Sequence, residues 1–466
     1  MTYTIQSIYK KMLGDLLSPV GLYLRLRDRF PNALLLESSD YNKKQNSYSY
    51  ICLQAMASFR ADRQQAQISY PDGSQQTISM QEQELAGALN DFVKAFRVEG
   101  DTFDFLTQGL FGYTSYDAIP MHHPVATEQL PMDVPLVHYQ YFRFVLVFNH
   151  FNNELYLVEN LPEHAGSELS LVEQCICSGA QPDYPFETLG SVDSNFTDEE
   201  FLKLIDQGKE HCYLGNVFQV VLSRQFSTGF KGDEFNVYRA LRSVNPSPYL
   251  FYFDYGAYKI MGSSPEAQIT IAHGKATIHP IAGTFKRTGN MEQDEELALA
   301  LANDPKENAE HVMLVDLARN DLSINSDAVQ VEKFKSVEMY SHVIHLVSKV
   351  AAELKEDYNA VEIFLNTFPA GTLSGAPKYR AMQLIDELEN TPRGFYGGAI
   401  GIIGLDGSFN HAIFIRSLWS RKQRLYYQAG CGVVARSVAQ SELQEIYNKV
   451  GAVTSAIKLA QNIEGH

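Results

Sequence analysis

The sequence predicts an α+β protein in which large antiparallel β-sheets form a sandwich-like core, with helices packed outside. Two observations lead to this prediction. Many apolar segments of strand length are separated by short turn signals, which favours antiparallel pairing over regular βαβ alternation. Segments with helical periodicity are interleaved among them, so the helices are expected to cover the sheets from outside.

The first part of the chain, residues 1–185, is predicted to mix strands and helix. Residues 33–38 (ALLLES) indicate a buried strand, and residues 83–98 have helical periodicity. The runs YFRFVLVF and ELYLVEN flank the turn residues NHFNN and predict a β-hairpin. The polar stretch 178–195 is the best candidate for a linker to a second part, residues 190–466.

The second part begins with a strong helix signal. Thr197 and Glu200 form a capping-box pattern before DEEFLKLIDQGKEHCYL, and Gly215 ends that run. Strands are predicted in VFQVVLSRQF, PYLFYFDYGAYKIMGSS, QITIAHGKATIHPI (turn at His273-Gly274), GGAIGIIGLDGSFNHAIFIRSLW (an Asp-Gly turn) and RLYYQAGCGVV. Further helices are expected at about residues 295–320, 337–354, 375–389 and 437–461.

The composition limits the classes of partner and compartment. The net charge of −17 disfavours nucleic acids and anionic membranes, because nothing offsets the repulsion from their phosphates. The cysteines lack partners at zinc spacing, so reduced thiols are expected at Cys52, Cys175, Cys177, Cys212 and Cys431. The first residues lack a signal-peptide pattern, and no apolar run is long enough to span a membrane. We therefore expect a soluble, cytoplasmic protein.

The run DPKENAEHVMLVDLARND carries three acids near a predicted helix start. Asp304 suits the N-cap, Pro305 the first helical position, and Glu307 the capping-box partner. Glu310 lies one turn further on, on the face of Glu307, and an apolar run follows it. Glu310 is therefore a candidate ligand or catalyst, although a structural role at the helix start would also explain it.

A second acidic pair follows two glycines. Glu442, Glu445 and Lys449 share one face of the last predicted helix, where a surface Glu–Lys pair is the simpler explanation. Gly430 and Gly432 precede this helix, allow close backbone approach, and leave N–H groups for an anion. A helix start beside such a turn predicts a carboxylate-binding site.

Four further segments hold polar side chains among apolar neighbours. Gln219 interrupts a buried strand, as either a structural bridge or a functional amide. An inward-facing Arg416 would need an anionic partner, His342 and His345 could be core histidines, and Thr372 could be a helix cap. Together these signals suggest a small di-acid bound by arginine, backbone amides and a divalent ion. Oxygen ligands without thiolate favour Mg²⁺.

Nine motifs resemble, in order, those of the chorismate-utilising enzymes, and most closely the large subunits (component I) of anthranilate synthases. They are SSPE, IHPIAGTFKRTG, DPKENAEHVMLVDLARNDL, YSHVIHLVS, FPAGTLSGAPK, YGGAIG, IFIRS, AGCGVV and SELQEIYNK. The resemblance runs continuously over about residues 197–460, and LLESSD and NPSPY extend it. It implies the fold of that family, chorismate and ammonia as substrates, and anthranilate and pyruvate as products.

The resemblance also implies a metal and substrate site. Glu310 and Glu445 would bind Mg²⁺, with Glu307 and Glu442 as carboxylates beside them. The enolpyruvyl carboxylate of chorismate would be held by Arg416, Tyr396 and the backbone N–H groups of Gly430 and Gly432, and the substrate site would also include Ala282, Gly283 and Thr284.

Four residues would take part in the chemistry, by the same resemblance. His345 would assist the loss of pyruvate, Thr372 would contact the substrate near the reacting carbons, and Lys449 would lie beside a metal-bound carboxylate. Isochorismate and salicylate synthases carry lysine where Gln219 stands, so a neutral amide there favours ammonia over water. His342 matches no functional position.

Two related functions remain as alternatives. Aminodeoxychorismate synthases typically carry lysine at the position of Ala282, which therefore points to amination at C2 instead. A non-catalytic chorismate or tryptophan sensor is the other alternative. Phe285 stands where the family usually has arginine, which leaves the loop contacts near Thr284 open.

The resemblance finally implies a partner and an inhibitor. No glutaminase segment of the G-x-C-x-G-x-Q type is present, so a separate amidotransferase subunit (component II) would supply ammonia in a heteromer. The LLES and NPSPY motifs resemble a feedback site for L-tryptophan, which makes residues 1–185 a regulatory region and residues 190–466 the chorismate-binding catalytic domain. The inhibitor site would consist of Glu37, Ser38, Asn245, Pro246, Ser247, Pro248 and Tyr249.

Overall fold

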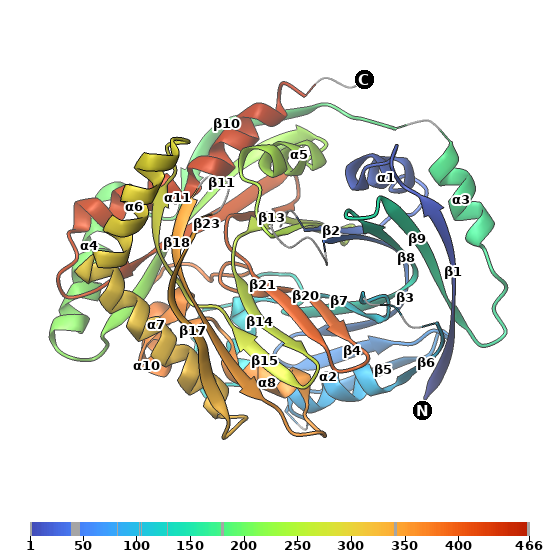
Figure 1. Cartoon of the computed structure of the whole chain (residues 1–466), viewed down its shortest axis with the longest axis horizontal. Helices are drawn as coiled ribbons and strands as arrows, with labels where there is room; N and C mark the ends of the chain where they lie inside the picture. The colour runs from blue at the N-terminus through green and yellow to red at the C-terminus, as the bar shows by residue number, and fades with distance from the viewer. Residues whose placement is uncertain are drawn as a thin grey trace.

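The predicted α+β fold is confirmed by the computed structural model, a curled antiparallel strand assembly with helices on its outside (Figure 1). The structure describes residues 2–38, 47–81, 83–101, 103, 105–127, 129–178, 181–339 and 343–463, and leaves the side chains of Thr284 and Lys306 undescribed. In the described part of the chain, no helix combines the length and apolar character needed to cross a membrane.

The strands carry most of the core. They are β1 (Tyr3–Leu13), β2 (Leu34–Glu37), β3 (Tyr48–Ala61), β4 (Gln65–Ser69), β5 (Gln75–Ser79), β6 (Phe96–Gly100), β7 (Gly109–Thr114), β8 (Val137–Asn149), β9 (Glu154–Pro162), β10 (Phe186–Ser194), β11 (Gln219–Gly232), β12 (Tyr249–Asp254), β13 (Tyr258–Ser264), β14 (Ala267–Ala272), β15 (Lys275–Ile278), β16 (Ile281–Lys286), β17 (Val329–Met339), β18 (Val343–Glu353), β19 (Gly375–Ala376), β20 (Ala399–Gly404), β21 (Phe409–Ile413), β22 (Ser417–Arg421) and β23 (Arg424–Val433).

The helices cover the outer faces of this assembly, and α4, α6, α7 and α10 gather on the left of Figure 1. They are α1 (Pro19–Leu26), α2 (Leu85–Lys94), η1 (Tyr116–Met121, a 3₁₀ helix), α3 (Leu169–Cys177), α4 (Asp198–Tyr213), α5 (Phe235–Val244), α6 (Met291–Asn303), α7 (Pro305–Ser323), α8 (Ala360–Thr367), α9 (Gly371–Ser374), α10 (Lys378–Leu388) and α11 (Ala439–Ala460).

Two strings of antiparallel strands leave the central pair β3–β8. One runs β3–β2–β12–β13–β22–β23–β11, and the other runs β8–β7–β20–β21–β14–β15–β18. The pairs β2–β12 and β7–β20 join strands from the two predicted parts of the chain. The sheets are thus shared between those parts, and a domain boundary at residues 185–190 stays a prediction.

Several predicted signals are confirmed in detail. Thr197 and Glu200 form the capping box of α4, and the positive φ of Gly215 follows that helix. His273 and Gly274 both have positive φ in the β14–β15 turn. Asp304 caps α7, since its Oδ1 accepts a hydrogen bond from the backbone N–H of Glu307 at 3.0 Å.

Three predicted segments are wrong. Within the segment 337–354, residues 337–339 belong to β17 and residues 343–353 form β18 instead of a helix, because a short apolar run buried on both faces has no periodicity that distinguishes strand from helix. The candidate linker contains β10, an edge strand whose exposed side chains look like a linker although its backbone pairs with β11. The helix expected at 295–320 is two helices that meet at Asp304.

An aromatic cluster lies where the two strings of strands pack together. It includes Phe111, Phe142, Phe251, Phe395 and Phe414 from several strands and a loop, all at most 4% exposed. Phe395 belongs to this cluster, and the next residue, Tyr396, belongs to the candidate active site.

Candidate active site

The two glycines of β23 lie against side chains from neighbouring segments. A Cβ atom on Gly432 would come within 2.3 Å of the Gln219 Nε2, and one on Gly430 within 2.6 Å of the Tyr396 hydroxyl. Only glycine therefore allows this approach. The structure brings together the predicted Gln219, Tyr396, Gly430 and Gly432.

Two predicted carboxylates approach this strand from different helices. The Gln219 Nε2 donates to the Glu310 Oε1 of α7 at 3.4 Å. On α11, the Glu445 Oε1 lies 2.6 Å from the Lys449 Nζ, which also donates to the Gly430 carbonyl at 2.8 Å. Lys449 therefore ties the acidic face of α11 to the glycine strand.

The donor chemistry fits Mg²⁺ with a small set of carboxylates. Among the residues that the structure describes, no three His, Cys, Asp or Glu side chains lie close enough to hold a metal ion together. Glu307 is half-buried on α7 and Glu442 is buried on α11, so the four predicted acids do not form one cluster. Mg²⁺ commonly binds through one or two carboxylates and completes its shell with water and substrate oxygens. A pair such as Glu310 and Glu445 would be enough carboxylates for a site of this kind.

His345 is held in one orientation by the neighbouring strand. Its Nδ1 lies 2.8 Å from the Gly283 carbonyl, and a carbonyl only accepts, so Nδ1 carries the hydrogen and Nε2 of the neutral ring is unprotonated. Burial lowers the pKa of His345, and the positive charge of Arg416 lowers it further. The hydrogen bond to the Gly283 carbonyl raises the pKa but does not outweigh these two effects. The ring is thus a neutral base at neutral pH. His342 lies outside the described residues.

The turn at Gly283 connects His345 to α7. Gly283 has φ +65°, and a Cβ there would meet the Leu301 Cδ1 at 2.5 Å and the Glu307 Oε2 at 3.0 Å. The register shift between Ala282 and Thr284 in β16 creates this turn, and Ala282 beside it is buried. The bulge therefore packs against the helices and brings Glu307 beside the backbone that orients His345.

Glu266 is a site residue that the sequence analysis missed. The Thr372 hydroxyl donates to its Oε1 at 3.0 Å. Burial raises the pKa of Glu266 to about 7, against the lowering effects of Thr372, Arg416 and Lys449. A pocket whose empty space is about 370 Å³, open solvent included, is lined by Glu266 and Thr372 among other residues. The SSPE motif offered the signal, since its acid directly follows the buried strand β13.

Glu266 is the acid whose charge acts on Arg416. Burial lowers the pKa of Arg416, and the negative charge of Glu266 acts against that effect. Arg416 also has φ +50°, an uncommon conformation for a residue with a side chain. The charge of Arg416 acts on both His345 and Glu266, and the charge of Lys449 acts on Glu266, so these four residues are electrostatic neighbours.

The two motifs of the predicted inhibitor site also meet. Leu250 of β12 lies opposite Glu37 of β2. Glu37 is 5% exposed, accepts from the Tyr238 hydroxyl at 2.7 Å, and lies 2.9 Å from the Arg242 Nε. Burial raises the pKa of Glu37 against these two partners. Around it, Ser247 is buried, Ser38, Asn245, Pro248 and Tyr249 are half-buried, and Pro246 is exposed.

Residues 32–455 match the family of chorismate binding enzymes, and the chain belongs to this family. Among its relatives, anthranilate synthase component 1 of Aquifex aeolicus is 36% identical over 98% of this chain and 96% of that protein. The protein of the same name from Bacillus subtilis is 34% identical over 96% and 91%. The crystal structure of anthranilate synthase component I from Streptococcus pneumoniae superposes with a TM-score of 0.78 and 31% identity, over 96% of this chain and 99% of that one.

Proposed function

We propose that this protein is component 1 of an anthranilate synthase, which converts chorismate and ammonia to anthranilate and pyruvate in tryptophan biosynthesis. Relatives of that name match nearly the whole chain. The observation that favours ammonia over water as the nucleophile is the neutral amide of Gln219. It is buried and donates to Glu310, and a neutral amide cannot deprotonate water, whereas ammonia brings its own lone pair. The methyl group of Ala282 cannot form the covalent adduct of a 4-aminating enzyme.

Chorismate carries two carboxylates, and the site offers two ways to hold them. Arg416, the Tyr396 hydroxyl and the N–H groups of Gly430 and Gly432 bind the enolpyruvyl carboxylate. The ring carboxylate faces Glu310 and Glu445, with Glu307 and Glu442 behind them, and these acids would repel it without a cation between. Mg²⁺ held there would neutralise the ring carboxylate and polarise the ring beside it.

Glu266 and His345 supply the proton transfers in this proposal. As ammonia bonds to C2, the bond from C4 to its hydroxyl breaks, and the hydroxyl departs as water with a proton from Glu266, whose pKa of about 7 suits a general acid. The new ammonium group at C2 then returns a proton to the Glu266 carboxylate. The Thr372 hydroxyl holds the Glu266 carboxyl in place near the reacting carbons. The His345 Nε2 then removes the proton at C2 as the bond to the enolpyruvyl oxygen breaks, which releases pyruvate and leaves the aromatic ring.

Ammonia is supplied by a partner in this proposal. The sequence has no glutaminase nucleophile segment, so a glutamine amidotransferase subunit (component II) forms a heteromer with this chain. A cytoplasmic location is consistent with the five cysteines, none of which forms a disulfide in the described residues.

L-Tryptophan is the proposed inhibitor, and it binds where β2 meets the NPSPY turn. Glu37 would receive the ammonium group, which has to compete with Arg242 for this carboxylate. The neighbouring Ser38 and the proline turn flank the indole. In this arrangement residues 1–185 form the regulatory region and residues 190–466 the catalytic domain. Binding that differs between two conformations would couple the two sites.

One assay tests the proposal against its alternatives. The chain is mixed with chorismate, Mg²⁺ and an ammonium salt at pH 8, and the products are separated and identified. Anthranilate, detected by its fluorescence, is the expected product. Formation of 4-amino-4-deoxychorismate would instead support the aminodeoxychorismate synthase alternative, and chorismate binding without turnover would support a sensor.

A further inference from the structure

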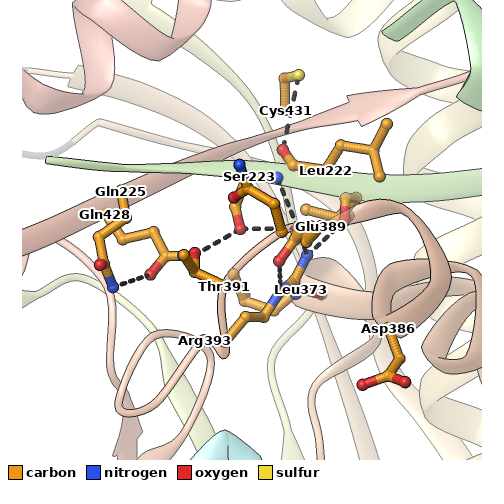
Figure 2. Close-up of polar contacts among 12 residues, drawn as sticks. Leu222, Ser223, Gln225, Leu373, Asp386, Glu389, Thr391, Arg393, Gln428 and Cys431 are labelled. Atoms are coloured by element: carbon orange, nitrogen blue, oxygen red, sulfur yellow. Dashed lines mark hydrogen bonds and ion pairs between the residues drawn. The ribbon is translucent and has the colours of Figure 1, made fainter. Parts of the chain in front are cut away.

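A fully buried ion pair contacts the strand that pairs with the two glycines of the proposed site. The side chains of Arg393 and Glu389 are 1% and 2% exposed, and the Arg393 Nη2 and Nε donate to the two Glu389 oxygens at 2.5 and 2.9 Å. Burial by itself would lower the pKa of Arg393, but the Glu389 carboxylate outweighs it and raises the pKa. Arg393 therefore stays charged, and Figure 2 shows the pair at the centre of a polar network.

Arg393 also holds two backbone carbonyls that belong to the site. Its Nη1 donates to the Leu373 carbonyl at 2.7 Å (Figure 2). Its Nη2 donates to the Val221 carbonyl at 2.6 Å. Leu373 follows Thr372, the residue that holds Glu266. Val221 lies opposite Gly432 in the pairing of β11 with β23. One guanidinium thus fixes the Thr372 turn relative to the glycine strand.

Glu389 fixes the same strand at a second point. Its Oε1 accepts from the backbone N–H and from the hydroxyl of Ser223, both at 2.8 Å, and the Gln428 Nε2 donates to that hydroxyl at 2.7 Å. Ser223 lies opposite Gly430. The ion pair therefore contacts β11 at the two residues that lie opposite the glycines of the proposed carboxylate site.

The third connection is to Tyr396. The Arg393 guanidinium lies over the Tyr396 ring, 5.7 Å from its centroid, and over the Tyr116 ring at 4.8 Å. The chain turns between Arg393 and Tyr396, and the Tyr396 N–H donates to the Arg393 carbonyl at 3.1 Å. The orientation of the Tyr396 hydroxyl against Gly430 therefore depends on where the guanidinium lies.

We infer that Arg393, paired with Glu389, is the positioning residue for chorismate binding: it sets Thr372, Tyr396 and the Gly430–Gly432 strand at the spacing that the enolpyruvyl carboxylate requires. This role rests on the proposed function of that carboxylate site. Only arginine supplies it, because a planar fork with five N–H groups serves the carboxylate and both carbonyls at once. Lysine keeps the charge but cannot keep this geometry.

The test separates positioning from stability. Arg393→Lys is expected to raise the KM for chorismate about tenfold or more, because the carboxylate contacts are made equally in the ground and transition states. The kcat should also fall, because the Thr372 turn that Arg393 holds positions Glu266. Arg143→Lys is the matched control. Arg143 lies 2.9 Å from the buried Glu159 and also donates to the Gly166 carbonyl, but it contacts no residue of the proposed site. The Arg143→Lys substitution should lower the thermal stability of the protein and leave the KM for chorismate unchanged.

A double variant, Arg393→Met with Glu389→Gln, removes both charges together, so neither is left buried alone and folding is retained. It should show the same rise in KM. A wild-type KM in either folded variant would overturn the inference and leave the pair a structural one. Titration calorimetry of chorismate without ammonia gives the same comparison independently of turnover. If the wild type binds chorismate but makes no anthranilate, the proposed reaction is contradicted. The role of Arg393 in chorismate binding can then still be tested by calorimetry.

Discussion

Replacing Glu266 by glutamine should remove turnover and, at alkaline pH, stabilise the protein. The carboxyl has a pKa of about 7 in the fold against 4.5 for an ordinary glutamate, mainly because burial disfavours its charge. Between those values the folded protein holds a proton that the unfolded chain has released, so stability falls as pH rises from about 4.5 to 7. The full loss is about 3 kcal/mol, at 1.36 kcal/mol for each pKa unit.

Glutamine has nearly the shape of the protonated carboxyl and does not ionise. At pH 5 the wild type and Glu266→Gln should therefore differ little in the free energy of unfolding. By pH 8 the variant should have gained about 2–3 kcal/mol relative to the wild type, since the folded wild type then carries the buried charge. An amide cannot act as a general acid, so turnover should fall about 100-fold or more.

Urea unfolding of both proteins at several pH values between 5 and 8 measures this gap. Glu353→Gln is the control, because the Glu353 side chain is 61% exposed and its stability should follow the wild type throughout. A constant difference between Glu266→Gln and the wild type at all pH values would refute the burial of the charge. Turnover at the wild-type rate would refute the role of Glu266 as the acid.

Three further outcomes follow from the proposed site. Glu310→Gln and Glu445→Gln should each abolish ammonia-dependent turnover in a folded protein, and full activity of either variant in chelator would remove Mg²⁺ from the site. His345→Met should accumulate 2-amino-2-deoxyisochorismate, identified by mass spectrometry, whereas untouched chorismate would place His345 in the first step or in the core. Ser38→Phe should fill the inhibitor site and relieve inhibition by L-tryptophan with little loss of turnover, while a wild type indifferent to millimolar tryptophan would leave that site without a role.

The sequence predicts strand and helix types well wherever a local signal carries them. The capping box of α4, the cap at Asp304 and the His273-Gly274 turn each rest on contacts within a few residues, and the structure contains all of them. The segment 337–354 failed because β18 is buried by β15, β16 and β17, and such pairing leaves no local trace.

In the candidate site, too, the sequence predicts what local motifs carry and misses contacts between distant segments. Motifs point to Gln219, Glu310, His345 and Arg416, but not to what each one touches. The Gly283 carbonyl that fixes the His345 tautomer and the Thr372 hydroxyl on Glu266 join segments far apart in the chain. The role of Arg393 is equally invisible in the run TPRGF, because its partners lie on three other segments.

Burial prepares the acid and the base of the proposed reaction together. Loss of water raises the pKa of Glu266 and lowers the pKa of His345, so near neutral pH one is protonated and the other is not. Ammonia taken from solution would need a higher pH, because its reactive free base becomes abundant only there. At that pH Glu266 is ionised and can no longer donate a proton. A partner subunit that delivers ammonia directly to the site removes this conflict. The raised pKa of Glu266 thus agrees with the proposed separate ammonia source.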